Sequence, residues 1–147
     1  MRSIYFDGTE RSNARWKALI EGPLAKARRF EIHCWTEETE AIKLALRFGT
    51  YQESDWIYGK IISGAVTEEF RAFVLEYPKP TDTEIHNKMT PFFNIFLDDD
   101  FQSCHWGNGD AFRYQTVTIC FIISKMKRKG EHHEIIRGKL CDPKKIR

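Results

Sequence analysis

The first residues whose type and spacing suggest chemistry are three consecutive aspartates, which begin at Asp98 and follow an apolar run. Carboxylate oxygens suit hard cations, so Mg²⁺ or Mn²⁺ is the expected ligand of such a cluster. In an extended chain Asp98 and Asp100 point the same way, and Asp110 is the candidate third ligand. With His105 or His86 as the general base, this pattern indicates a metal-dependent phosphodiester hydrolase. A solvated turn that closes a buried strand is the alternative interpretation.

Two dipeptides, His33-Cys34 and Cys104-His105, combine the side chains that bind zinc. Neighbouring residues on a strand point to opposite faces, so each dipeptide offers one ligand to any one site. Zinc is therefore a weaker expectation than Mg²⁺ or Mn²⁺. Cys104 is also an alternative nucleophile, provided that the fold brings a histidine such as His33 to its thiol. The competing interpretation is a half-exposed histidine beside a buried, inert thiol in each dipeptide.

Charge is distributed unevenly along the chain, although the formal total is only +2. Residues 124–147 hold nine Lys and Arg against three Asp and Glu, which gives +6 and leaves −4 for residues 1–123. Because lysine and arginine contact phosphates, nucleic-acid binding is a second alternative function. Basic residues that flank an apolar strand also prevent aggregation, and the acidic remainder argues against a general polyanion binder. The residues that would contact a nucleic acid are Lys125, Lys127, Arg128 and Lys129.

Aromatic residues support the leading interpretation. The chain has four Trp, five Tyr and eleven Phe, too many for every ring to be buried in a small domain. Trp and Tyr are enriched at binding hot spots. Trp35 is expected on the non-core face of a strand with Glu31 and His33, and Trp106 in a glycine-bounded loop. Because the sequence contains no complete catalytic set, these four residues favour a non-catalytic protein-binding module of the inhibitor, immunity or adaptor type, without a cofactor.

Hydrophobic periodicity predicts the elements that must position these residues. Alternation over residues 30–35 indicates a half-buried strand whose even-numbered residues face the core. Thr36 and Thr67 are predicted helix N-caps, because each precedes two glutamates. A first helix is expected over residues 11–20 and should break at the Gly-Pro pair that follows. The other predicted strands are residues 4–6, 56–62, 91–97, 115–123 and 131–137.

Together these elements predict an α+β protein with one domain over residues 1–137 and a basic, frayed tail over residues 138–147. The sheet should be mainly antiparallel, with about four to six strands and two or three helices packed on one face. The longest apolar run has seven residues, far short of the ~18 that a membrane span requires, and Asp7 precedes any signal-sequence core. We therefore expect a cytoplasmic protein without membrane association, whose four cysteines are free thiols. The oligomeric state stays open.

Overall fold

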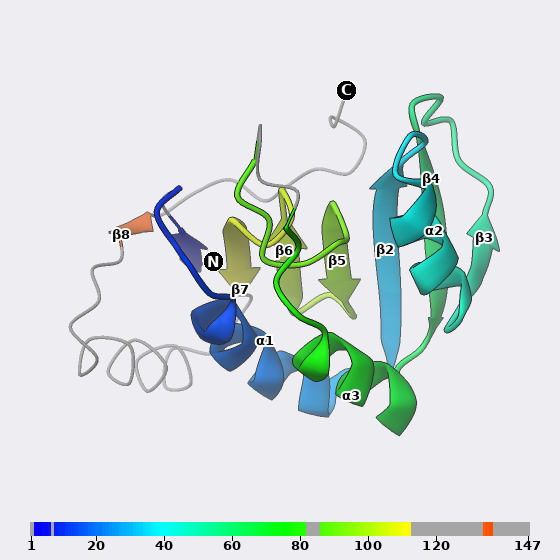
Figure 1. Cartoon of the computed structure of the whole chain (residues 1–147). Coiled ribbons are helices and arrows are strands. Elements are labelled where there is room, and N and C mark those ends of the chain that lie inside the picture. The colour runs from blue at the N-terminus through cyan, green and yellow to red at the C-terminus, as the bar shows by residue number, and fades with distance from the viewer. Residues whose placement is uncertain (1, 7, 82–85, 113–133, 137–147) are drawn as a thin grey trace.

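Short antiparallel strands dominate the fold. The computed structural model describes residues 2–6, 8–81, 86–112 and 134–136, the last of these as backbone only. Within these residues one eight-stranded sheet has the order β3-β4-β2-β5-β6-β7-β1-β8, and every neighbouring pair is antiparallel (Figure 1). Its strands are β1 (Arg2–Tyr5), β2 (Arg29–Trp35), β3 (Thr50–Gln52), β4 (Gly59–Ala65), β5 (Asn94–Leu97), β6 (Phe101–Cys104), β7 (Gly109–Phe112) and β8 (Glu134–Ile136).

Three described helices pack on one face of this sheet. They are α1 (Ala14–Lys26), α2 (Thr39–Leu46) and α3 (Glu68–Glu76). On that face Phe30 of β2 stacks on Phe70 of α3 with ring centroids 4.2 Å apart. Trp16 of α1 is buried, and its Nε1 donates a 2.9 Å hydrogen bond to Ser103 Oγ of β6. The predicted α+β class, with an antiparallel sheet and helices on one face, is confirmed. No described helix combines the length and the apolar character that crossing a membrane requires.

The described sheet has more strands than the four to six expected. The additional strands, β3, β6 and β7, are three or four residues long and lack the long apolar runs on which the prediction depended. β6 forms because its residues pair with the end of β5, where Phe101 lies opposite Leu97. The strands predicted over residues 56–62 and 91–97 begin later, at Gly59 and Asn94.

α1 continues through Pro23, so the predicted break at Gly22 and Pro23 is wrong. Proline inside a helix removes a backbone donor and costs about 3 kcal/mol. The last turn of α1 offsets this cost by burying Leu24 completely. Arg71 of α3 also donates from Nε to the Leu24 carbonyl at 3.0 Å and from a terminal nitrogen to the Ala27 carbonyl at 3.4 Å. Tertiary packing therefore outweighs the local preference of Gly22 and Pro23 to end the helix.

The two predicted threonine caps have different outcomes. Thr67 Oγ1 accepts a 3.1 Å hydrogen bond from the Phe70 N–H, so Thr67 caps α3 as predicted. Thr36 instead lies in the turn before α2, and Glu38 occupies the cap position without a side-chain cap bond. The prediction for Thr36 is wrong because the chain makes one more turn after β2 before the helix begins.

Several sequence predictions fall outside the described residues. The strand over residues 115–123 and the tail over residues 138–147 are among them. β8 lies within the strand predicted over residues 131–137, and it pairs with β1. Also outside are the basic residues Lys125, Lys127, Arg128 and Lys129.

Candidate protein-binding surface

A chain of hydrogen-bonded polar side chains crosses the sheet face opposite the described helices. His33 of β2 and Asn94 of β5 are cross-strand partners, and both are completely buried. His33 Nε2 lies 2.6 Å from Glu31 Oε1, and His33 Nδ1 lies 3.3 Å from Asn94 Nδ2. Asn94 Oδ1 accepts a 3.3 Å hydrogen bond from the His105 backbone N–H. Two buried side chains thus link Glu31 to the β6–β7 turn.

The His105 backbone N–H determines which ring nitrogen of His33 carries the proton. Because that donor needs an oxygen, Asn94 presents its NH₂ group to His33, and we assign Nδ1 of the ring as the acceptor. The ring proton is then on Nε2 and is donated to Glu31. This hydrogen bond holds the pKa of the Glu31 carboxyl below its usual value, although partial burial opposes the shift. With both ring nitrogens engaged, His33 orients Glu31 and has no nitrogen left for a metal or a substrate.

Glu31 lines an open hollow of about 730 Å³ on this sheet face, and its side chain is 43 % exposed. The hollow extends across strands β4, β2, β5 and β6 and reaches the end of β3. Among the described residues, four carboxylates and one guanidinium line it, which gives an excess of negative charge. These charged residues are Glu31, Glu53, Asp98, Asp99 and Arg29.

Four aromatic rings pack together where β2 ends. Trp35 lies 5.2 Å from Trp56 and 5.0 Å from Phe93 between ring centroids, and Phe93 lies 4.8 Å from Trp106. Trp106 is only 7 % exposed, and its Nε1 donates a 2.6 Å hydrogen bond to Glu38 Oε1. The same carboxylate accepts from the Trp35 N–H at 3.0 Å through Oε2. The cluster is therefore fixed by ring contacts and by one shared acid.

Of the four residues that the sequence predicts to bind a partner, two are buried and two are partly exposed. Trp106 and His33 are buried, so their side chains are not available for direct contact with a partner. Trp35 and Glu31 are partly exposed on the same sheet face, as their alternation along β2 predicted. Direct contact of Trp35 and Glu31 with a partner stays a prediction.

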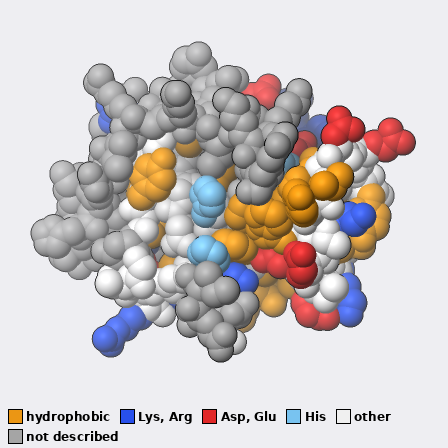
Figure 2. All heavy atoms as spheres, turned by 90° about the horizontal axis from the view of Figure 1, so that it is seen from above, with side chains coloured by type: hydrophobic (Ala, Val, Ile, Leu, Met, Phe, Trp, Pro, Cys, Tyr) orange, Lys and Arg blue, Asp and Glu red, His pale blue; other side chains and the backbone are white. Residues whose placement is uncertain are grey.

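A more exposed hydrophobic surface lies on β3 and the connection to β4. Tyr51, Ile57 and Tyr58 are 54 %, 79 % and 53 % exposed, and we call these three residues the β3–β4 patch. Exposed acids, Glu53 and Asp55, lie in the same segment. Figure 2 shows hydrophobic side chains next to acidic ones on the side of the molecule that carries α2, β3 and β4. Sequence reasoning missed the patch because it assigned part of this connection to a strand. The polar run that precedes Trp56 was the available signal for a turn.

Gly59 leaves room for the Trp56 ring and thereby keeps Ile57 and Tyr58 of the β3–β4 patch exposed. A Cβ atom at Gly59 would lie 2.2 Å from two ring carbons of Trp56 and 2.6 Å from the Cys34 carbonyl oxygen. Glycine therefore leaves room for the Trp56 ring to dock on the end of the strand, 5.7 Å from the His33 ring. With Trp56 docked inward, the two residues that follow it form the exposed turn. The Tyr58 carbonyl accepts a 2.9 Å hydrogen bond from the Thr36 N–H, which ties this turn to the end of β2.

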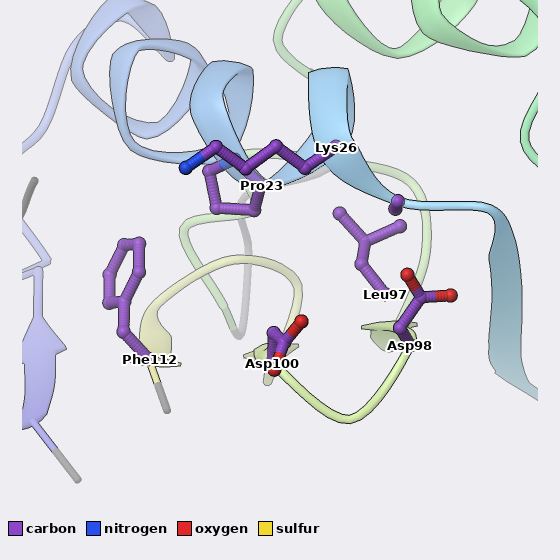
Figure 3. Close-up of a pocket in the computed structure, with 7 residues that line it drawn as sticks. Pro23, Lys26, Leu97, Asp98, Asp100 and Phe112 are labelled. Carbon is purple, nitrogen blue, oxygen red and sulfur yellow. The ribbon is translucent and has the colours of Figure 1, made fainter. Parts of the chain in front are cut away.

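The three aspartates form a structural turn. Asp98 has a left-handed backbone (φ 47°), and its carboxylate accepts hydrogen bonds of 2.9 to 3.3 Å from the Arg28 and Arg29 N–H groups. Asp98 and Asp100 line a cavity of only about 20 Å³ beside the end of α1 (Figure 3). Asp110 is buried on β7. Among the described residues, no group of three His, Cys, Asp or Glu side chains could hold a metal ion. This part of the chain gives the hydrolase alternative no support.

The cysteines and the remaining candidate histidines occupy separate places. Cys34 and Cys104 are both buried, and strand alternation places them on opposite faces of the sheet. Burial raises the pKa of the Cys34 thiol, and the Glu38 carboxylate raises it further, so Cys34 is a poor nucleophile. His105 and His86 are exposed, and His86 stacks on the Trp106 ring with centroids 4.6 Å apart. The arrangement favours structural thiols over a Cys–His catalytic pair.

Comparison with known proteins identifies no relative of this chain. No protein-family model, curated protein sequence or solved structure matches it. Function is therefore inferred from the chemistry of the surface.

Proposed function

We propose that this protein is a non-catalytic module of the inhibitor, immunity or adaptor type that binds another protein through the β3–β4 patch. The exposure of Tyr51, Ile57 and Tyr58 on one short segment carries this proposal. Exposed apolar patches on small proteins mark interaction sites, and tyrosine is enriched among residues that dominate binding energy. The neighbouring acids Glu53 and Asp55 supply the polar rim that such interfaces have.

The residues beneath the patch support the same proposal. Trp35 is the cross-strand partner of Gly59, which directly follows Tyr58, so its half-buried ring lies beside the turn that carries Ile57 and Tyr58. The packed rings of Trp35, Trp56 and Phe93 form a rigid base for the turn. A preorganised surface binds more tightly because it loses less conformational entropy on association.

The cytoplasm is the compartment that we propose for this module. Cys34 and Cys104 are buried as reduced thiols. Reduced cysteines are typical of compartments in which glutathione and thioredoxin keep thiols reduced. Recognition through the β3–β4 patch requires no cofactor.

The test is a comparative affinity capture from the extract of the source cells, with quantitative mass spectrometry. A patch variant replaces the three patch residues with serine, and its fold is checked by circular dichroism. A matched control replaces three exposed helix residues, Glu21, Ala25 and Glu69, with serine. We expect a protein that the wild type and the control retain and the patch variant loses. Proteins that all three variants retain equally would contradict the proposal.

A further inference from the structure

The acidic hollow opposite the helices has a regular row of side chains across its floor. Strand register places Ser63, Glu31, Phe96 and Gln102 side by side on β4, β2, β5 and β6. Neighbouring strands are about 4.8 Å apart, so Glu31 and Gln102 are separated by about 10 Å with the Phe96 ring between them. All four residues line the hollow. A half-buried aromatic ring flanked by Glu31 and Gln102 is thus part of this surface.

Glu31 is preorganised to accept a hydrogen bond from outside the protein. Its Oε1 is held by the buried His33, which fixes the orientation of the carboxylate. Within the described part of the chain, Oε2 accepts no hydrogen bond, and the side chain is 43 % exposed. An oriented and half-exposed carboxylate has already paid part of the entropic cost of binding.

Gln102 supplies a second acceptor in the same row. Its Oε1 is buried and has no hydrogen-bond partner among the described residues. A buried carbonyl oxygen without a partner is unfavourable, so a ligand whose donor reaches it gains affinity. The described residues that line the hollow carry four carboxylates and one guanidinium, which selects a donor with positive charge.

We propose that this hollow binds an arginine-bearing segment of the protein partner, with the guanidinium over Phe96 and hydrogen-bonded to Glu31. A guanidinium is planar, stacks on aromatic rings and donates two parallel hydrogen bonds to a carboxylate. Its aliphatic stem suits the apolar wall formed by Ile61. Lysine shares the charge but lacks the planar fork. The inference rests on the proposed function, since it names the chemistry of the partner at an adjoining surface.

The probe is a short fluorescent peptide in which arginine alternates with glycine, titrated into the full-length protein. The same peptide with citrulline in place of arginine keeps the shape and removes the charge. We expect saturable binding of the arginine peptide, weaker binding of a lysine peptide and none of the citrulline peptide. Binding should weaken as salt is raised to about 0.3 M, because partly exposed charges are screened. In ¹H–¹⁵N spectra the shifted amides should be those of β2, β5 and β6.

Two matched variants test the role of Glu31. Glu31→Gln removes the charge from the hollow, whereas Glu69→Gln makes the same change on an exposed helix position. We expect Glu31→Gln to weaken the arginine peptide about tenfold, as loss of a charge-assisted hydrogen bond does, and Glu69→Gln to leave it unchanged. Asp99→Asn, at the exposed rim of the hollow, should weaken binding by a smaller factor.

Three results of the peptide titrations and spectra would overturn this inference. They are no saturable binding, equal weakening by Glu31→Gln and Glu69→Gln, and amide shifts confined to other parts of the protein. A hollow already filled by another segment of this chain or by a second copy would give the first result. A captured partner that the β3–β4 patch variant loses and Glu31→Gln retains with unchanged affinity would overturn the inference and leave the proposed function standing. A partner that neither variant affects would overturn both.

Discussion

Substitution of Asn94 by leucine is the sharpest test of the buried hydrogen-bond chain. Asn94 is completely buried, its Nδ2 faces His33 Nδ1, and its Oδ1 accepts from the His105 N–H. Leucine has a similar volume and removes both polar atoms. The variant therefore leaves a fully buried acceptor on His33 and a partly buried donor at His105.

The expected loss of stability follows from these two groups. An unsatisfied buried acceptor costs about 2 kcal/mol, and the more exposed donor at His105 about 1 kcal/mol. The apolar contacts that leucine gains stabilise the folded variant by about 1 kcal/mol. We therefore expect Asn94→Leu to lower the free energy of unfolding by about 2 kcal/mol. With a urea m-value of about 2 kcal/mol/M, the midpoint of unfolding falls by about 1 M.

The assay is urea unfolding followed by circular dichroism, with Gln102→Leu as the control. Gln102 lies on the same sheet face, but its Oε1 is buried without a partner among the described residues, so this change should not lower the free energy of unfolding. Imidazole ¹⁵N spectra of the wild type should show His33 with its proton on Nε2. The reasoning would be refuted by an Asn94→Leu protein as stable as the wild type, by a control that loses as much, or by a wild-type proton on Nδ1.

Two further substitutions test the neighbouring contacts. Because His33 holds the pKa of Glu31 low, the stabilisation is present above the ordinary carboxyl pKa of about 4.5 and is lost as pH falls through the lower folded value. Glu31→Gln should therefore cost about 1 kcal/mol at neutral pH, after allowance for solvent screening, and almost nothing at a pH below the folded pKa of Glu31. Equal costs in urea unfolding at both pH values would contradict this. Gly59→Ala should expel the Trp56 ring, shift tryptophan emission to the red and cost about 1–3 kcal/mol. Gly8→Ala, where a Cβ meets no atom within 4 Å, is the control, and unchanged emission from Gly59→Ala would show that the ring is not held as described.

The sequence predicted the elements whose pattern is local. Alternation along β2 placed Phe30, Ile32 and Cys34 toward the helices and Glu31 and His33 on the other face. The Thr67 cap was also predictable, because its bonding group is three residues from its partner. These features depend on periodicity and capping alone, which any single sequence displays.

Tertiary contacts decided the features that the sequence did not reveal. α1 passes through Pro23 because Leu24 is buried and Arg71 of another helix bonds its last carbonyl groups. β6 and β7 are too short to have a pattern of their own and exist through pairing with their neighbours. No local sequence pattern predicts the continuation of α1 through Pro23 or the strands β6 and β7.

The sequence predicted the kinds of residue on the candidate surface, aromatic and acidic, but not which of them are exposed. Glu31 and Trp35 lie on the predicted face, but Trp106 is buried and bonded to Glu38, which is far away in the sequence. The exposed residues of the β3–β4 patch are outside the residues that the sequence singled out. The exposure of Ile57 and Tyr58 depends on the docking of Trp56 against Gly59, which only the folded chain creates.

The most direct test of the central claim is the dissociation constant of the captured partner, measured by calorimetry against the wild type, the patch variant and the helix-face control. Hot-spot residues contribute about 2 kcal/mol or more, so the patch variant should bind at least about 30-fold more weakly while the control binds like the wild type. Equal dissociation constants for all three proteins would contradict the assignment of the β3–β4 patch as the binding surface.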